Sequence, residues 1–190
     1  MIRFFKDHSK IICRLLLYQF GAAFLGITVS FVTAQSNTAV DLIGSIFAIT
    51  FYLVLIYMVM WEEGAKERIK IDGGRAPYKP LKGLSLSLFA NIPNVIIAVM
   101  ILVGFIFGKK DGPFAFSWGT SIYAVFRMIA LVWESMFNGI VRLYSPRNPS
   151  IFFLIIFPAL GVCTLGYFLG LRNRRILGFI PARRSKKPEK

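Results

Sequence analysis

Residues 114–144 read FAFSWGTSIYAVFRMIALVWESMFNGIVRLY, and this stretch decides how the chain is arranged. On a helix that turns about 100° per residue, its polar side chains share one face. They are Ser117, Thr120, Arg127, Glu134, Asn138 and Arg142. The opposite face is apolar and consists of Ile122, Val125, Ile129, Val132, Met136 and Ile140. We therefore expect one amphipathic helix over 114–144, whose polar stripe has a structural or functional role.

The composition of the whole chain is that of a membrane protein. Of 190 residues, 56% are hydrophobic and 17% are charged, whereas soluble domains carry about 25% charged residues. Phenylalanine alone contributes 19 residues. The length and composition predict a single membrane-embedded helical domain over residues 1–190, without a separate soluble domain.

Four further apolar runs are long enough to cross a membrane. A helix needs about 20 apolar residues to span a hydrocarbon core of about 30 Å. The runs lie at 15–34, 42–61, 84–107 and 151–171. Between them lie a basic N-terminus (1–14), a polar loop (62–83) and a basic tail (172–190). Small residues before Gln35 allow signal-peptide cleavage, but the first run is longer than a signal h-region, so we expect an uncleaved helix.

The distribution of basic residues predicts the topology. The formal net charge is +14, from 23 Lys and Arg against 9 Asp and Glu. Basic residues of polytopic membrane proteins collect in cytoplasmic segments, so we interpret the excess as topology and expect no nucleic-acid binding. If all five runs cross, 12 basic residues lie on one side and 10 on the other; if 114–144 does not cross, the division is 18 to 4. The bias therefore favours four crossings, with both termini cytoplasmic.

Two runs compete to be the one that does not cross. Making 84–107 re-entrant divides the basic residues 20 to 2, which is slightly better on charge alone. However, 114–144 contains Arg127 and Glu134, and a charge at the bilayer centre costs roughly 2.5–3.5 kcal/mol on insertion scales. We therefore expect 114–144 to be a partial, re-entrant or interfacial helix beside four transmembrane helices. The five-crossing arrangement is the alternative.

Arg127, Glu134, Asn138 and Thr120 form the candidate polar site in the membrane. Arg127 and Glu134 lie seven residues apart, about 10.5 Å along a helix, so they could pair or bind separate partners. Three interpretations remain open: the stripe lines a polar path, faces water at the membrane surface, or docks against a partner subunit.

A second polar feature interrupts the run at 84–107. Asn91 and Asn94 flank Pro93, which removes a backbone donor and predicts a kink. The two asparagines could form a polar site inside the bundle, where they would satisfy the freed backbone groups. We expect instead that they lie near the cytoplasmic interface, because they occupy the early part of the run.

Small residues mark candidate helix-packing faces. Ala22, Gly26 and Ser30 recur every four positions in the first run, and Gly166 and Gly170 form a GxxxG motif in the last. Small residues let helix backbones approach closely in lipid. The sequence favours packing within the chain over an interface with a partner or a second copy.

The basic tail suits contact with anionic lipid. Its basic residues follow the last apolar run and alternate with apolar side chains. They are Arg172, Arg174, Arg175, Arg183, Arg184, Lys186 and Lys187. Such clusters attract anionic headgroups, at about 1 kcal/mol per basic residue near the surface.

Residues for enzymatic or metal chemistry are sparse. Cys13 and Cys163 lie in apolar surroundings without a neighbouring Cys or His, and His8 is the single histidine. We therefore expect no disulfide, metal or cofactor. No Ser/His/Asp, HExxH or P-loop pattern is present, which predicts a protein that is not an enzyme.

The sequence thus predicts an all-α, polytopic protein of the plasma membrane. Its packing motifs and lack of soluble domains favour a non-catalytic accessory or assembly subunit that acts through helix packing, with a second copy or another membrane subunit as its partner. The alternative is a small transporter or channel that uses the Arg127/Glu134 stripe.

Overall fold

The computed structural model describes residues 2–33, 37–75, 77–108, 118–144 and 148–174, with side chains from His8 onward. Within these ranges the chain is helical and contains no strand, which confirms the predicted all-α class. The elements are α1 (Ile2–Thr33), α2 (Thr38–Asp72), α3 (Lys82–Ala90), α4 (Ile92–Gly108), α5 (Trp118–Trp133), the 3-10 helix η1 (Ser135–Phe137), α6 (Asn138–Tyr144), α7 (Ile151–Leu154) and α8 (Ile156–Leu171).

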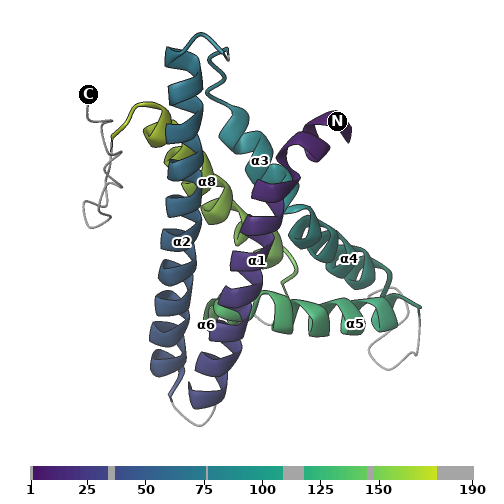
Figure 1. Cartoon of the computed structure of the whole chain (residues 1–190). Helices are drawn as coiled ribbons and strands as arrows, with labels where there is room; N and C mark the ends of the chain where they lie inside the picture. The colour runs from purple at the N-terminus through teal and green to yellow at the C-terminus, as the bar shows by residue number, and fades with distance from the viewer. Residues whose placement is uncertain (1, 34–36, 76, 109–117, 145–147, 175–190) are drawn as a thin grey trace.

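Helices α1 and α2 run antiparallel and side by side (Figure 1). The 35 residues of α2 make it about 52 Å long at 1.5 Å per residue, more than the hydrocarbon core of about 30 Å. The predicted span 42–61 is its apolar part, which lies between Asp41 and Glu62. The last three turns of α2 therefore extend the helix beyond the apolar stretch.

Two helices are broken inside apolar sequence. Helices α3 and α4 meet at Asn91 with a bend of 54°, and α5 meets the η1–α6 segment at Glu134 with a bend of 87°. Among the described residues, three helices are long and apolar enough to cross a membrane, or up to five if each bent pair forms one span. Several helices are thus long and apolar enough to cross a membrane, as the composition predicts.

The structure corrects the single amphipathic helix predicted over 114–144. Residues 114–117 lie outside the described residues, α5 ends at Trp133, and Glu134 leaves the helical conformation with φ −110° and ψ 25°. No proline or glycine marks this point in the sequence. The break follows instead from contacts that η1 and α6 make with α1 and α2.

Helix α8 packs along α2, and glycines bring the two backbones together. A Cβ atom at Gly170 would overlap the Trp61 carbonyl, and one at Gly64 would overlap the Tyr167 carbonyl. The break between α7 and α8 falls at Ile155, three residues before Pro158. Proline has no N–H to bond the carbonyl of the preceding turn, so the helix loses regular support there.

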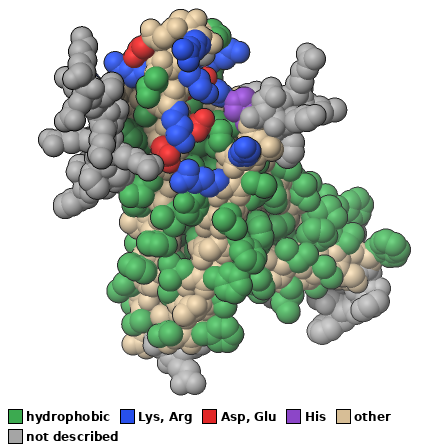
Figure 2. Space-filling view, in the orientation of Figure 1, with side chains coloured by type: hydrophobic (Ala, Val, Ile, Leu, Met, Phe, Trp, Pro, Cys, Tyr) green, Lys and Arg blue, Asp and Glu red, His purple; other side chains and the backbone are tan. Residues whose placement is uncertain are grey.

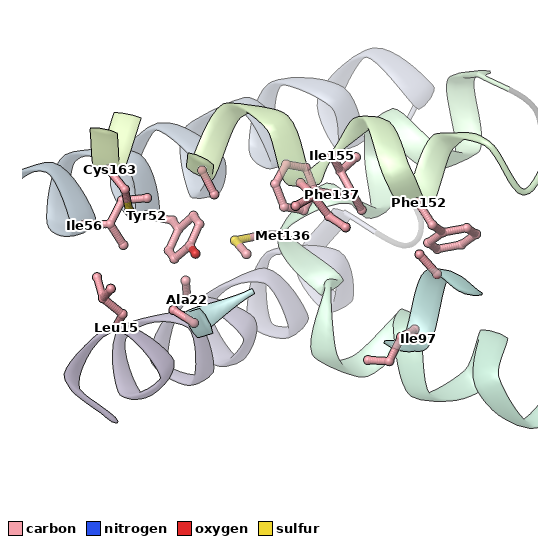
Figure 3. Packing of buried hydrophobic residues seen from close by; sticks show 14 of the residues in the cluster. Leu15, Ala22, Tyr52, Ile56, Ile97, Met136, Phe137, Phe152, Ile155 and Cys163 are labelled. Atoms are coloured by element: carbon pink, nitrogen blue, oxygen red, sulfur yellow. The ribbon is translucent and has the colours of Figure 1, made fainter. Parts of the chain in front are cut away.

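The core lies where α1, α2, η1 and α8 meet. Figure 3 shows Met136 of η1 close to Tyr52 of α2 and Ala22 of α1, all of them buried. Cys163 of α8 belongs to the same cluster. The break at Glu134 is therefore anchored in the centre of the packed bundle.

The ends of the molecule differ in character. Charged side chains gather where α1 begins and α2 ends, while the rest of the face in Figure 2 is mainly apolar. The end of α8 lies toward this same charged end, and α5 lies across the direction of α2 in the other half of the molecule (Figure 1). The fold thus has a charged end, a long apolar body and one helix set crosswise.

Candidate polar site between two helix breaks

The break between α3 and α4 carries a network of buried polar side chains. The Asn91 side-chain amide donates to the Ser87 carbonyl oxygen at 2.9 Å, and the same oxygen accepts the backbone N–H of Asn91 at 3.0 Å. The Asn94 amide donates to Asn91 Oδ1 at 2.9 Å. Asn94 Oδ1 in turn accepts hydrogen bonds from Gln19 Nε2 at 2.6 Å and from Trp133 Nε1 at 2.7 Å. The network therefore joins α1, α3, α4 and α5.

The asparagines are buried among the helices of the bundle. Asn91 and Asn94 are 3% and 6% exposed. Gln19, which donates to Asn94, is also buried. It was not identified from the sequence, because a single glutamine in an apolar run has no spacing pattern that indicates its hydrogen-bond partner. Buried amides need hydrogen-bond partners in an apolar environment, and here three amides and one indole supply them to one another.

Glu134 stands at the second break. It is 3% exposed, and neither carboxyl oxygen has a hydrogen-bond partner among the described residues. Its two neighbours are fixed from opposite sides: Trp133 donates to Asn94, and the Ser135 hydroxyl donates to the Ala23 carbonyl of α1. The carboxyl is thus held in the protein interior by the residues on either side of it.

Helix α6 is tied to the α1–α2 pair. The Gly139 N–H donates to Ser45 Oγ at 2.9 Å, and a Cβ atom at Gly139 would crowd the Asp41 carbonyl. The Arg142 guanidinium lies 3.2 Å from Asp41 Oδ2, while Thr33 donates to Asp41 Oδ1 at 2.9 Å. These contacts hold α6 against α2 and fix the angle at Glu134.

The predicted stripe is divided by the bend. Arg127 Nη1 donates to Tyr123 Oη at 3.0 Å, and its guanidinium lies 5.9 Å from the Phe152 ring centroid. No ion pair joins Arg127 to Glu134, both of which are described residues. Thr120 contacts Gly108 of α4, and the Asn138 amide donates to the Leu131 carbonyl at 3.2 Å. Only Glu134 and Asn138 lie in the buried segment at the break.

Helix α5 points its apolar side outward. Arg127 is partly buried, whereas Val125, Met128 and Val132 are exposed. This orientation suits a helix in contact with lipid and is the opposite of an amphipathic helix that turns its polar stripe to water. After the break, the bend turns Met136 into the core.

The glycines among the predicted packing residues contact other helices of the same chain. A Cβ atom at Gly26 would overlap the backbone of Ser135 and Met136, and Gly166 contacts the Tyr57 carbonyl. Ala22 is buried, while Ser30 is half-buried.

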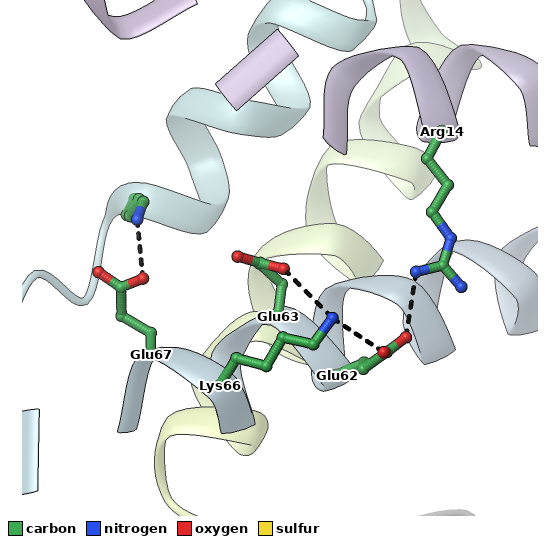
Figure 4. Close-up of polar contacts among 6 residues, drawn as sticks. Arg14, Glu62, Glu63, Lys66 and Glu67 are labelled. Atoms are coloured by element: carbon green, nitrogen blue, oxygen red, sulfur yellow. Dashed lines mark hydrogen bonds and ion pairs between the residues drawn. The ribbon is translucent and has the colours of Figure 1, made fainter. Parts of the chain in front are cut away.

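A chain of ion pairs occupies the charged end (Figure 4). Glu62 pairs with Arg14 at 3.1 Å and with Lys66 at 2.9 Å, which links α1 to α2. Lys82 of α3 pairs with Glu67 at 2.8 Å, and both side chains are largely buried. Of the predicted lipid-binding cations, Arg172 and Arg174 are exposed here; Arg175, Arg183, Arg184, Lys186 and Lys187 lie outside the described residues.

The comparisons with known proteins leave the site to be interpreted from its chemistry. No protein-family model, curated protein or solved structure matches the chain. Among the described residues, no group of three His, Cys, Asp or Glu side chains could hold a metal ion. The chemically distinctive feature is therefore the unpartnered carboxyl beside a carboxamide network.

Proposed function

We propose that this protein carries protons or small cations across a membrane and that the Glu134 carboxyl binds the ion. The observation that carries the proposal is a carboxyl that is 3% exposed without a hydrogen-bond partner among the described residues. A charged carboxylate in such a place is costly, and binding a proton or a cation relieves that cost. Ionisable residues inside membranes commonly mark ion pathways.

The two helix breaks support this proposal. Transporters often build their binding sites from discontinuous helices, because irregular backbone in the membrane needs internal polar partners. Here the breaks at Asn91 and Glu134 are connected through the Asn94–Trp133 hydrogen bond. A change in the ionisation of Glu134 would act directly on the joint between α5 and η1.

The sequence left open whether Arg127 and Glu134 pair, and the proposed ion site uses Glu134 without Arg127. Arg127 is bound to Tyr123 of its own helix and lies against Phe152 of α7, so it is assigned to holding α5 on α7. The proposal therefore assigns ion binding to Glu134 alone.

We also propose four crossings with both termini cytoplasmic: α1, α2, the α3–α4 pair and the α7–α8 pair cross, and α5 to α6 form the partial element. The crosswise direction of α5 supports this arrangement (Figure 1). So does the gathering of charged residues at the end where α1 begins and where α2 and α8 end.

The test is ion flux in proteoliposomes. Protein is reconstituted into vesicles that contain a pH-sensitive dye, and a potassium diffusion potential, negative inside, drives proton entry. Parallel vesicles with sodium- or potassium-sensitive dyes test the cations. We expect flux above that of empty vesicles for the wild type and background flux for Glu134→Gln, which keeps the shape and removes the ionisable group.

Glu62→Gln is the matched control, since it removes one carboxyl at the solvated end of α2. It should retain wild-type flux. Size-exclusion chromatography and circular dichroism establish that both variants are folded. Absence of proton, sodium and potassium flux in the wild type overturns the transport proposal, and wild-type flux in Glu134→Gln overturns the role of this carboxyl.

An accessory subunit is the second candidate function. The observation that favours it is the exposed apolar face of α5, which includes Val125, Met128 and Val132 and which a partner helix could cover. The contacts of Gly26 and Gly170 are already taken up by this chain's own backbone, so they give this candidate no support. Purification in mild detergent without any co-purifying partner, as a monomer, contradicts it.

A further inference from the structure

The charged end contains a groove between α1 and α2. The groove has a volume of about 800 Å³, which lies in the range of ligand-binding clefts. Tyr18, Leu55 and Met58 line one part of it, while Arg14, Lys66 and Arg68 line another. It therefore combines an apolar part with a cationic part.

Along α2, the residues that line the groove change from apolar to cationic, as expected for a helix that passes from lipid into water. Leu55 and Met58 belong to the apolar stretch, Trp61 ends it, and Lys66 and Arg68 follow one to two turns later. Tryptophan is enriched at membrane–water interfaces, so Trp61 marks that boundary. The apolar part of the groove thus lies on the lipid side of Trp61, and the cationic part lies on the water side.

A second hollow adjoins the groove and adds positive charge. It has a volume of about 490 Å³ and shares Arg68 and Asp72 with the groove. Arg172 and Arg174 also line it, at the end of α8. Together the two hollows contain five basic residues and two acidic ones, Glu62 and Asp72. Their combined lining is therefore positively charged.

We propose that the groove binds one anionic phospholipid from the bilayer. An acyl chain lies against Leu55 and Met58, and the phosphate lies among Arg14, Lys66 and Arg68. Charge complementarity selects an anionic headgroup, because the joined hollows carry a positive excess. This site is separate from Glu134 and does not depend on ion transport.

The existing ion pairs leave these cations available. Arg14 and Glu62 are each nearly half exposed in their 3.1 Å pair, and Arg68 pairs with Asp72 at 3.3 Å, also at the surface. Exposed ion pairs contribute little to stability. A phosphate can therefore take over hydrogen bonds from these guanidinium groups without disrupting the helices.

Lipid titration followed by native mass spectrometry tests the proposal. Delipidated protein in detergent is titrated with phosphatidylglycerol or with phosphatidylcholine of identical acyl chains. We expect one phosphatidylglycerol molecule to bind more tightly than phosphatidylcholine. Arg68→Gln should weaken phosphatidylglycerol binding about fivefold, the effect of one basic residue near a charged headgroup.

Lys70→Gln is the control for charge, because Lys70 is exposed on the same helix but does not line either hollow. Met58→Trp tests the apolar part by filling it without a change in charge, and Phe51→Trp is its control on the exposed side of α2. Glycerol phosphate, which has no acyl chain, should not compete at equal concentration.

The proposal predicts losses for Arg68→Gln and Met58→Trp with near wild-type binding for Lys70→Gln and Phe51→Trp. Equal losses for Arg68→Gln and Lys70→Gln overturn it in favour of diffuse electrostatic attraction. Equal binding of the two lipids, or no effect of Met58→Trp, also overturns it. All variants are compared only where circular dichroism shows the same helix content.

Discussion

The hydroxyl of Ser135 donates a hydrogen bond to the backbone carbonyl of Ala23, across 112 positions of the sequence. A helical carbonyl oxygen has a second lone pair, so it can accept this bond while it remains in the helix. The contact holds η1 directly against the middle of α1. It explains why the chain bends at Glu134 without any local helix breaker.

The first prediction concerns the close approach that this bend requires. Gly26→Ala places a Cβ atom on the backbone of Ser135 and Met136, where only movement of η1 makes room. We expect a loss of about 1–3 kcal/mol in stability, the usual cost of overpacking. Thermal unfolding in detergent, followed by circular dichroism, measures the change. Gly21→Ala on the same helix meets nothing within 4 Å and should be neutral or stabilising.

A second prediction tests the GxxxG motif in α8. Gly170→Ala brings a Cβ atom against the Trp61 carbonyl and separates α8 from α2. We expect a loss of similar size, about 1–3 kcal/mol, because backbone cannot move aside as a side chain can. Gly161→Ala lies on the same helix in open space and should leave the unfolding temperature unchanged or raise it. Equal unfolding temperatures for the two variants would contradict the close packing of α2 and α8.

The sequence predicted the helices better than their breaks. Apolar runs of about 20 residues identify spans such as 42–61 because length and hydrophobicity are local properties. The bend near Asn91 also has a local cause in Pro93. The break at Glu134 has none, since it depends on Ser135 and Ala23 meeting in three dimensions. A helical wheel assumes one continuous helix, so the predicted polar stripe continued past the break at Glu134.

The candidate site was predicted only in part, for the same reason. Glu134 stands out in the sequence as an acid in an apolar run, but spacing alone left open whether it pairs with Arg127 or takes another partner. In the structure, Arg127 donates a hydrogen bond to Tyr123. Gln19, Asn94 and Trp133 form a hydrogen-bonded group that ends next to the break. Residues that meet from three helices cannot be identified by spacing along one of them.

A third prediction measures the coupling within this network. Asn94→Leu leaves Gln19 Nε2 and Trp133 Nε1 without their acceptor. Hydrogen bonds between membrane helices average about 0.6 kcal/mol, so we expect a loss of about 1–2 kcal/mol. A double-mutant cycle with Gln19→Leu should give a coupling of about 0.6 kcal/mol. The control cycle uses Thr50→Val, an exposed residue bonded within its own helix, and should give no coupling.

The fourth prediction contrasts two buried acids. Glu67→Gln removes the negative charge that pairs with Lys82, whose Nζ atom is 2.8 Å away and largely buried, and it should cost about 2–3 kcal/mol. Glu134→Gln removes a carboxyl that has no hydrogen-bond partner among the described residues, so it should leave stability unchanged or raise it. Denaturant unfolding in the same detergent compares the two variants. A large loss for Glu134→Gln would show that this carboxyl has a stabilising partner and would argue against its role as an ion site.

The fifth prediction concerns the side of the membrane on which each loop lies. Single cysteines are introduced into a background in which Cys13 and Cys163 are replaced by serine and alanine. Intact cells are then treated with a membrane-impermeant maleimide, before and after permeabilisation. Asn37, which precedes α2, marks the outer side in the four-crossing arrangement, and Tyr78, which precedes α3, marks the inner side.

In that arrangement, cysteines at Lys110 and Ser145 both react in intact cells, as a cysteine at Asn37 does. A cysteine at Tyr78 reacts only after permeabilisation. The reason is that the chain between these two positions enters the bilayer and returns to the same side. Reaction at Lys110 alone means that the segment crosses, which makes five crossings and places the end of α8 outside. Reaction at Ser145 alone makes the α3–α4 pair the partial element. The broken helix at Asn91 would then be the re-entrant one, and the charged end would still face the cytoplasm.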